Sequence, residues 1–206
     1  EAGLRGEGRT ALWVDRNPPS PPTLHHPQAG GYTRDRALTV VGESEALARV
    51  RVHVGGSSAD AQADANGQWS IQTTLAEGRN AIWAEAWDPA GNRSTPSPAV
   101  ARVLDTVSPT LAVSAPPVAR AGGDLTISAS VADSNPVGQV VLTLPDAPGA
   151  AETPLLRQGG LWRTTVTLPK ATGEGAHTAR ARAWDAAGNV GLGETAFVVD
   201  NTPPSG

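Results

Sequence analysis

Apolar and polar residues alternate along most of the chain in short extended stretches. In residues 49–54 (RVRVHV) every second residue is valine, which gives an extended segment one apolar face and one polar face. Asn66-Gly67 predicts a hairpin turn, because this pair readily adopts positive φ. Similar runs predict strands over 37–43, 49–54, 69–75, 82–88 and 100–105, and again over 111–114, 125–131, 137–144, 162–168, 178–184 and 196–200. The pattern is typical of an all-β protein built from antiparallel β-sandwiches.

The order of these segments occurs twice. Residues 86–92 (AWDPAGN) recur as 183–189 (AWDAAGN), and GQW at 67–69 recurs as GLW at 160–162. Each copy closes with a strand ending in Asp and a Pro-bearing linker, and this ending also appears near the N-terminus as ALWVDRNPP. The repeat implies a longer parent protein. It predicts the last strand and linker of an earlier module (1–17), two complete modules (18–107 and 108–202) and the start of another linker (203–206).

The orphan strand over 9–15 alternates apolar and polar residues but has lost its own module. Both complete modules already have a closing strand, and an unpaired apolar strand is a template for edge pairing. We therefore expect this strand to pair with another chain or with remaining parts of its parent module.

Side-chain sizes predict where the core lies. Trp69 and Trp162 each begin a strand face, while the neighbouring penultimate strands place only alanines inward. A large indole opposite small side chains fills the layer between two sheets without overpacking. We therefore expect both tryptophans to be buried in the core.

Composition and charge exclude several classes of protein. The 206 residues include 23 Gly and 18 Pro, which argues against a mainly helical chain. There is no Cys, so disulfides and Cys-bearing zinc sites are excluded. The net charge of −4 argues against nucleic-acid binding, and no apolar run is long enough to enter a membrane. His25 and His26 lie in a Pro-rich entry segment, and His53 and His177 stand on separate strands without obvious acidic or serine partners, so we expect no enzymatic activity.

Three short motifs resemble a known family. They are the D-x-A-G-N turn (88–92 and 185–189), the N-G-x-W hairpin (66–69) and the Asp-to-Pro linker (105–109 and 200–204). Together they are similar to the bacterial Ig-like domains found in tandem in large surface proteins and adhesins. The resemblance implies two tandem Ig-like sandwiches with an extracellular or cell-surface, stalk-like or adhesive role. It identifies no ligand, because such sandwiches host many functions.

The D-x-A-G-N turn has two interpretations. Its Asp can accept hydrogen bonds from the backbone of the turn, which explains the motif without a ligand. An Ig-like topology would instead bring hard oxygen ligands from three segments together at each module junction, as Ca²⁺ requires. No cofactor is required by the first interpretation, and calcium is the candidate in the second. The candidate ligands are Asp105, Asp133, Asp185 and Asn189 at one junction, and Asp15, Asp88 and Asn92 with Glu43 or Glu45 at the other.

Three tryptophans are predicted to face away from the core. Trp83, Trp87 and Trp184 alternate with the inward alanines, on an outer face shared with Glu85, Arg180 and Arg182. One interpretation is packing, in which the indoles cover Pro-rich linkers or stack on Arg. The other is a stacking platform for sugar rings. Trp83 has Arg180 as its counterpart in the second module, which makes it the better lone candidate for a ligand contact.

These observations predict spacer modules of a secreted or surface-anchored bacterial protein, with neighbouring Ig-like modules as partners. Short Pro-rich linkers would limit bending, so that stacked modules project other domains. Two alternatives stay open. One is an adhesive module that binds a glycan or a surface protein through the outer tryptophans, and the other is an accessory module of an extracellular enzyme.

Overall fold

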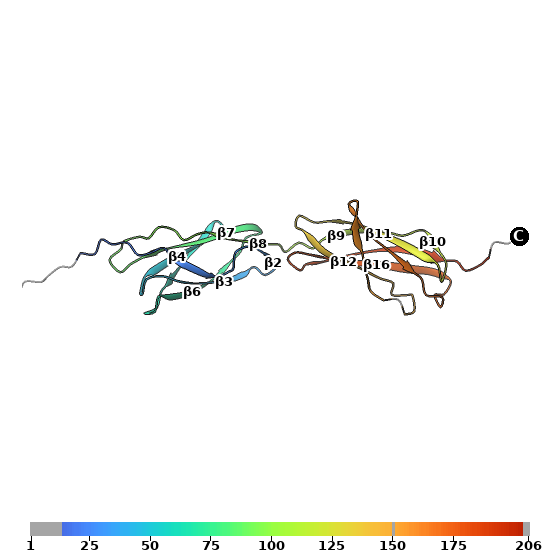
Figure 1. Cartoon of the computed structure of the whole chain (residues 1–206), viewed down its shortest axis with the longest axis horizontal. Coiled ribbons are helices and arrows are strands. Elements are labelled where there is room, and N and C mark those ends of the chain that lie inside the picture. The colour runs from blue at the N-terminus through green and yellow to red at the C-terminus, as the bar shows by residue number, and fades with distance from the viewer. Residues whose placement is uncertain (1–13, 150, 204–206) are drawn as a thin grey trace, which may run out of the picture. The chain divides into compact units, whose positions relative to one another are not determined.

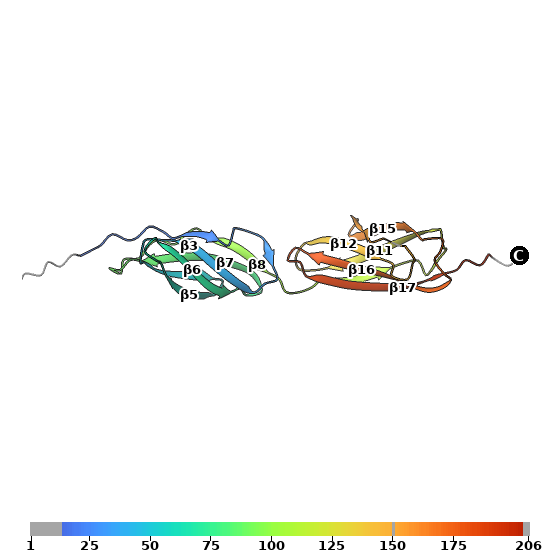
Figure 2. The same cartoon turned by 90° about the horizontal axis from the view of Figure 1, so that it is seen from below.

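The computed structural model describes residues 14–149 and 151–203, and these form strands, turns and loops (Figures 1 and 2). The chain divides into two compact units. One contains the residues up to Gly30 together with Ala37–Arg102, and the other contains Gly31–Arg36 and the residues from Val103 onward. Packing therefore assigns to the second unit a few residues that the repeat gives to the first module. None of the described residues belongs to a helix that could cross a membrane.

The sheets of the first sandwich pair as an Ig-like fold requires. A three-stranded sheet has the order β1-β3-β6, and a five-stranded sheet has the order β2-β8-β7-β4-β5. Strand pairs are antiparallel, apart from β2 with β8. The strands are β1 (Thr23–His26), β2 (Tyr32–Thr33), β3 (Ala37–Glu43), β4 (Arg49–Val54), β5 (Ser57–Gln62), β6 (Gln68–Thr74), β7 (Gly78–Trp87) and β8 (Val100–Leu104).

The second sandwich repeats the order of these strands and adds one. Its sheets have the orders β14-β15-β11-β9 and β10-β17-β16-β12-β13. The strands are β9 (Thr110–Ser114), β10 (Val118–Ala119), β11 (Asp124–Ala132), β12 (Val137–Thr143), β13 (Thr153–Pro154), β14 (Leu156–Gln158), β15 (Leu161–Thr167), β16 (Gly175–Asp185) and β17 (Val190–Val199). The added strand is β14, a short strand beside β15. The predicted all-β class with two tandem antiparallel sandwiches is confirmed.

The core of each sandwich lies between its sheets, as the side-chain sizes predict. Trp69 is 3% exposed, and the inward alanines of β7 and β16 are fully buried. Trp162 differs, because it is only partly buried at the rim of the second core. The residue opposite Trp69 on the neighbouring strand is Gly42, whereas Ala129 lies opposite Trp162. The prediction is therefore confirmed for Trp69 and only in part for Trp162, which packs against the second core but is not fully buried.

Gly42 makes room for the Trp69 indole. A Cβ built at Gly42 would overlap the indole ring and the carbonyl oxygen of Thr23. We expect Gly42→Ala to lower the free energy of unfolding of the first sandwich by about 1–3 kcal/mol, the usual cost of overpacking a core. Chemical denaturation of the full chain measures this. Gly56→Ala is the matched control, because a Cβ there meets no atom within 4 Å; equal losses in both variants would contradict the steric account.

The predicted orphan strand over 9–15 lies mostly outside the described residues. Of its positions, Val14 and Asp15 are described, and neither belongs to a strand. Pairing of this segment with another chain stays a prediction.

Candidate functional site

The D-x-A-G-N turn is held by its own aspartate in both units. Asp185 Oδ1 accepts hydrogen bonds from the backbone N–H groups of Ala187 and Asn189 at 2.8 and 2.9 Å, and its Oδ2 accepts one from Asn189 Nδ2 at 2.8 Å. Asp88 accepts the same pair of bonds from the backbone and side chain of Asn92. The Asn92 side-chain bond is the main cause that lowers the pKa of Asp88. The local interpretation of the motif thus has a clear geometric basis.

The asparagine of the turn also binds the aspartate of the entering segment. Asn189 Nδ2 donates to the carbonyl oxygen of Asp105 at 2.8 Å, and Asn92 Nδ2 donates to the carbonyl oxygen of Asp15 at 3.2 Å. Both asparagines therefore use their amide N–H groups in these contacts. The turn and the entering segment are joined in the same way in both units, which explains why the Asp-to-Pro linker and the turn repeat together.

Three carboxylates gather in the second unit, and we call them the three-carboxylate cluster: Asp105, Asp133 and Asp185. One oxygen of each lies within 4.8 Å of the others. Asp105 is 1% exposed and Asp185 is 6% exposed. The sequence placed these three residues at one site, and the structure brings them together. Asp105 lies just after β8, Asp133 just after β11, and Asp185 is the last residue of β16.

The cluster has hydrogen-bond donors but no cationic partner among the described residues. Asp105 accepts from Val107 N and from Asn135 Nδ2, at 3.0 and 2.7 Å. Asp133 Oδ1 accepts from Asn135 N at 2.7 Å. Asp133 Oδ2 is buried and has no donor. Three carboxylates this close together offer the oxygen ligands that a hard cation prefers.

The first unit does not gather its candidate ligands in this way. Asp15 is exposed, and Glu43 lies 3.5 Å from His25. Within residues 14–149 and 151–203, neither Asp15 nor Asp88 belongs to a group of three metal-ligating side chains. Asp133 lies four residues after Ala129, which is opposite Trp162. The equivalent residue of the first unit, four residues after Gly42, is Ala46. The first unit therefore shares the turn but lacks the third carboxylate.

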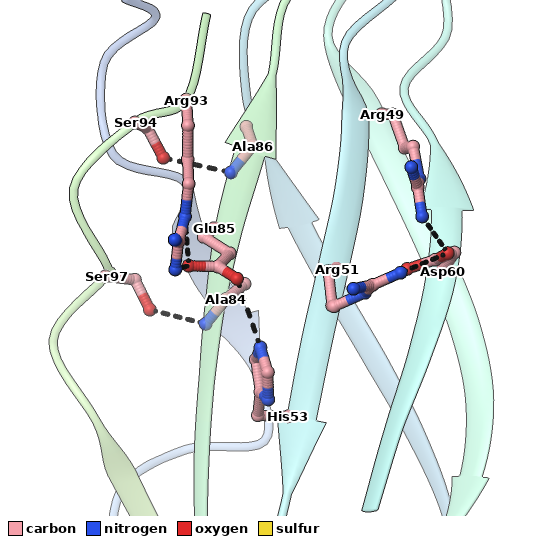
Figure 3. A network of polar contacts seen from close by, with 10 residues as sticks. All are labelled: Arg49, Arg51, His53, Asp60, Ala84, Glu85, Ala86, Arg93, Ser94 and Ser97. Atoms are coloured by element: carbon pink, nitrogen blue, oxygen red, sulfur yellow. Dashed lines mark hydrogen bonds and ion pairs between the residues drawn. The ribbon is translucent and has the colours of Figure 1, made fainter. Parts of the chain in front are cut away.

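A polar network covers the outer face of β4, β5 and β7 in the first unit (Figure 3). Glu85 is only 3% exposed, although the sequence placed it on the open outer face. Its carboxylate is paired with Arg93 and lies 3.4 Å from His53 Nε2. His53 thus has an acidic partner that the sequence analysis did not identify, because the pairing of β4 with β7 places the two side chains together.

Arg93 lies in an irregular segment, residues 93–98, where the second sandwich has a regular strand. Residues 93–98 follow β7 in the position that β17 takes beside β16, but they contain two prolines. Ser94 and Ser97 compensate, because their hydroxyl oxygens accept the N–H groups of Ala86 and Ala84 at 2.9 and 3.0 Å (Figure 3). Side-chain oxygens thus satisfy backbone donors that would otherwise be buried without a partner.

The three outer tryptophans are each covered in part by a neighbour. Trp83 stacks on His53 with ring centroids 3.7 Å apart and planes at 6°. Guanidinium groups lie 5.4–5.7 Å from the other two rings, three of them (Arg49, Arg51 and Arg93) at Trp87 and one (Arg182) at Trp184. All three indoles are half-buried. The geometry favours the packing interpretation, and ligand contact by these residues stays a prediction.

The same face of the second unit carries a shallow groove of about 660 Å³. It lies over β12, β16 and β17. Leu192, which is 72% exposed, forms one side of it. Ion pairs of Arg180 with Glu194 and of Arg182 with Glu152 lie at this face. This groove is not evident from the sequence, because it depends on the register that places Leu192 beside Arg182.

The Asp60 ion pairs predict an acid-sensitive contribution to stability. Hydrogen bonds from Arg51 and then Arg49 hold the pKa of Asp60 far below its usual value. A carboxyl with a lowered folded-state pKa stabilises the fold above its unfolded pKa, about 3.9, and this stabilisation is lost as the pH falls toward the folded-state value. We expect the urea midpoint of the first sandwich to fall less between pH 5 and pH 2 in Asp60→Asn than in the wild type. Parallel pH profiles would contradict this.

Comparisons with known proteins agree with this architecture. The model of the bacterial Ig-like domain matches residues 27–106, from the end of β1 to just beyond β8. The resemblance inferred from the sequence motifs is thereby confirmed for the first module. No curated protein matches the sequence.

Several solved structures are similar over most of the chain. The fibronectin(III)-like modules of CbhA from Clostridium thermocellum are 18% identical, with 88% of this chain and 94% of that chain covered and a TM-score of 0.49. A tetra-tandem repeat in the extending region of a large adhesion protein is 19% identical, with 88% and 49% covered and a TM-score of 0.42. SGBP-B of Bacteroides ovatus, in complex with a mixed-linkage heptasaccharide, is 17% identical, with 88% and 47% covered and a TM-score of 0.30.

Proposed function

We propose that this chain is a spacer segment of a large extracellular or surface-anchored bacterial protein. In this role, tandem Ig-like modules hold other domains away from the cell or assembly and have no catalytic task. We further propose that the second unit binds calcium at the three-carboxylate cluster. The observation that supports calcium most directly is the buried, unpartnered Asp133 Oδ2 beside two other carboxylates.

The residues of the cluster fit a hard cation. Asp105, Asp133 and Asp185 supply only oxygen ligands, and Ca²⁺ takes six to eight of these, including backbone carbonyls and water. When bound, the ion would neutralise the three carboxylates and join them. Asp133 would contribute its free oxygen, while Asn135 and Asn189 keep Asp105 and Asp185 in position through the hydrogen bonds described above.

This arrangement suits a spacer because it fixes the segment after β8. Asn189 already holds the backbone of Asp105, and Val107 N–H caps its side chain. A cation shared by Asp105, Asp133 and Asp185 would add a second link between that segment and the loops of the second unit. A module fixed in this way resists local opening at the point where force enters it.

Pulling on single molecules tests the proposed function. We expect two separate unfolding events, one for each sandwich, and we expect calcium to raise the unfolding force of one of them. Asp133→Asn should remove the effect of calcium without removing either event. Unfolding at low force in a single step, or two events that do not respond to calcium in the wild type, would contradict the proposal.

A second candidate function is adhesion through the outer face, which the groove over β12, β16 and β17 supports. Its apolar side and the neighbouring ion pairs offer both apolar and polar contacts. Affinity electrophoresis in glycan gels, with Trp83→Ala, Trp87→Ala and Trp184→Ala, distinguishes the two functions. Retardation of the wild type that is lost in one of these variants would support adhesion, and equal mobility in all gels would exclude it for the glycans used.

A further inference from the structure

Strand β6 ends the three-stranded sheet of the first sandwich. All seven residues of Gln68–Thr74 pair with β3, from Ala37 opposite Thr74 to Glu43 opposite Gln68. Within the described parts of the chain, no strand pairs with the other side of β6. Alternate residues of an edge strand direct N–H and C=O groups outward. Gln68 already bonds Asp64 through its N–H and C=O groups, so the backbone groups of β6 that remain able to accept another strand lie beyond Gln68.

The sequence of β6 contains none of the usual features that prevent edge pairing. The seven residues QWSIQTT include no charged residue, no proline and no glycine. Their register with β3 runs without a bulge. Natural edge strands are usually short, charged, bulged or interrupted by proline. By contrast, edge strand β5 carries Asp60, and edge strand β13 ends in Pro154.

The second sandwich shows what a covered edge looks like. β15 is the counterpart of β6, and β14 pairs with it opposite Leu161, Trp162 and Arg163. In the first sandwich the strand directly before β6 in the sequence is β5, and it pairs with β4 in the other sheet. The edge that β14 covers in the second sandwich is thus left open along β6.

The side chains of β6 suit pairing with themselves. Gln68, Ser70, Gln72 and Thr74 are exposed and uncharged. In an antiparallel pair of β6 strands centred on Ile71, each Ser70 lies opposite Gln72 of the other copy, and each Trp69 lies opposite Thr73. No like charges meet, Ile71 lies opposite its own copy, and the larger Trp69 and Gln72 lie opposite the smaller Thr73 and Ser70.

We propose that β6 is a self-association edge, at which a second copy of this chain adds its own β6 antiparallel and centred on Ile71. The two three-stranded sheets would then form one continuous six-stranded sheet across a two-fold axis. One strand pair buries little surface, so the contact is weak and transient. It becomes effective where many copies are held close together, because tethering raises the local concentration.

Cysteine cross-linking tests both the contact and its register, since the native chain has no cysteine. We expect a mixture of Ser70→Cys and Gln72→Cys chains to form mixed disulfide dimers at least tenfold faster than either variant alone, because only the mixed pair lies directly opposite. The matched control is a mixture of Arg163→Cys and Thr165→Cys on β15, where β14 pairs with Arg163. Mixed β6 dimers that form no faster than this control would overturn the proposal.

A charge on the edge provides a second readout that does not depend on disulfides. The sedimentation-average mass of the wild type should rise with concentration, and Ser70→Lys should remove this rise while Ser70→Thr keeps it. Both variants should keep the wild-type melting temperature, since residue 70 is exposed.

A chain without residues 1–13 should associate to the same extent as the full chain. Association that appears only after this deletion would show that the N-terminal segment occupies the edge, and would overturn pairing between native copies.

Discussion

Replacing Trp69 by alanine should lower the free energy of unfolding of the first sandwich by roughly 3–5 kcal/mol, the usual cost of truncating a buried aromatic side chain. The indole is 3% exposed and lies against Gly42, so little can move into the space it leaves. Calorimetry on the full chain should show one of two transitions shifted strongly to lower temperature. Such a loss is a large part of the stability of a domain this size.

Trp162→Ala is the matched control for this prediction. Trp162 has the equivalent position on β15 but is only partly buried. Its replacement should therefore cost clearly less than that of Trp69. Equal losses at the two positions would show that the difference in burial does not determine the contribution of these indoles.

Replacing Arg93 by alanine should destabilise the first sandwich by about 3 kcal/mol, the lower end of the cost of leaving a buried charge without its partner. Glu85 is nearly inaccessible to water, and His53 would be its remaining ion-pair partner (Figure 3). The loss is not larger because the Arg93 side chain is itself more than half exposed. Chemical denaturation measures the change.

Two further variants separate charge from packing at this network. Adding Glu85→Gln to Arg93→Ala should recover part of the loss, because no unpaired charge is then buried. Arg49→Ala should cost less than about 1 kcal/mol, since its pair with Asp60 is exposed and Arg51 keeps its own bond to that carboxylate. If the double variant is less stable than Arg93→Ala, the buried charge is not the cause.

The strand plan could be predicted because it depends on local patterns. Alternating valines fixed the two faces of β4, and the inward alanines of β7 and β16 followed from the same period of two. One element is much longer than predicted, because β17 begins at Val190, six residues before the predicted start at 196. The two glycines of β17 hid its first half, because glycine is normally a sign of weak strand structure.

The remaining features depend on contacts between strands, which a single sequence does not reveal. The half-buried position of Trp162 depends on Ala129 across the sheet, and the burial of Glu85 depends on Arg93 from an irregular segment. The three-carboxylate cluster was foreseen because the Ig-like topology places its three segments together. The unpartnered Oδ2 of Asp133 could not be predicted from the sequence. It depends on the hydrogen bonds of Asn135, which donates to Asp133 Oδ1 and to Asp105 instead.

A calcium titration of the full chain by calorimetry tests the central claim most directly. The first unit serves as an internal control, because Ala46 stands where the second unit has Asp133. We predict one binding event per chain, a rise of several degrees in the melting temperature of the second unit alone, and loss of both effects in Asp133→Asn. No heat of binding and no change in either transition at millimolar calcium would contradict the account.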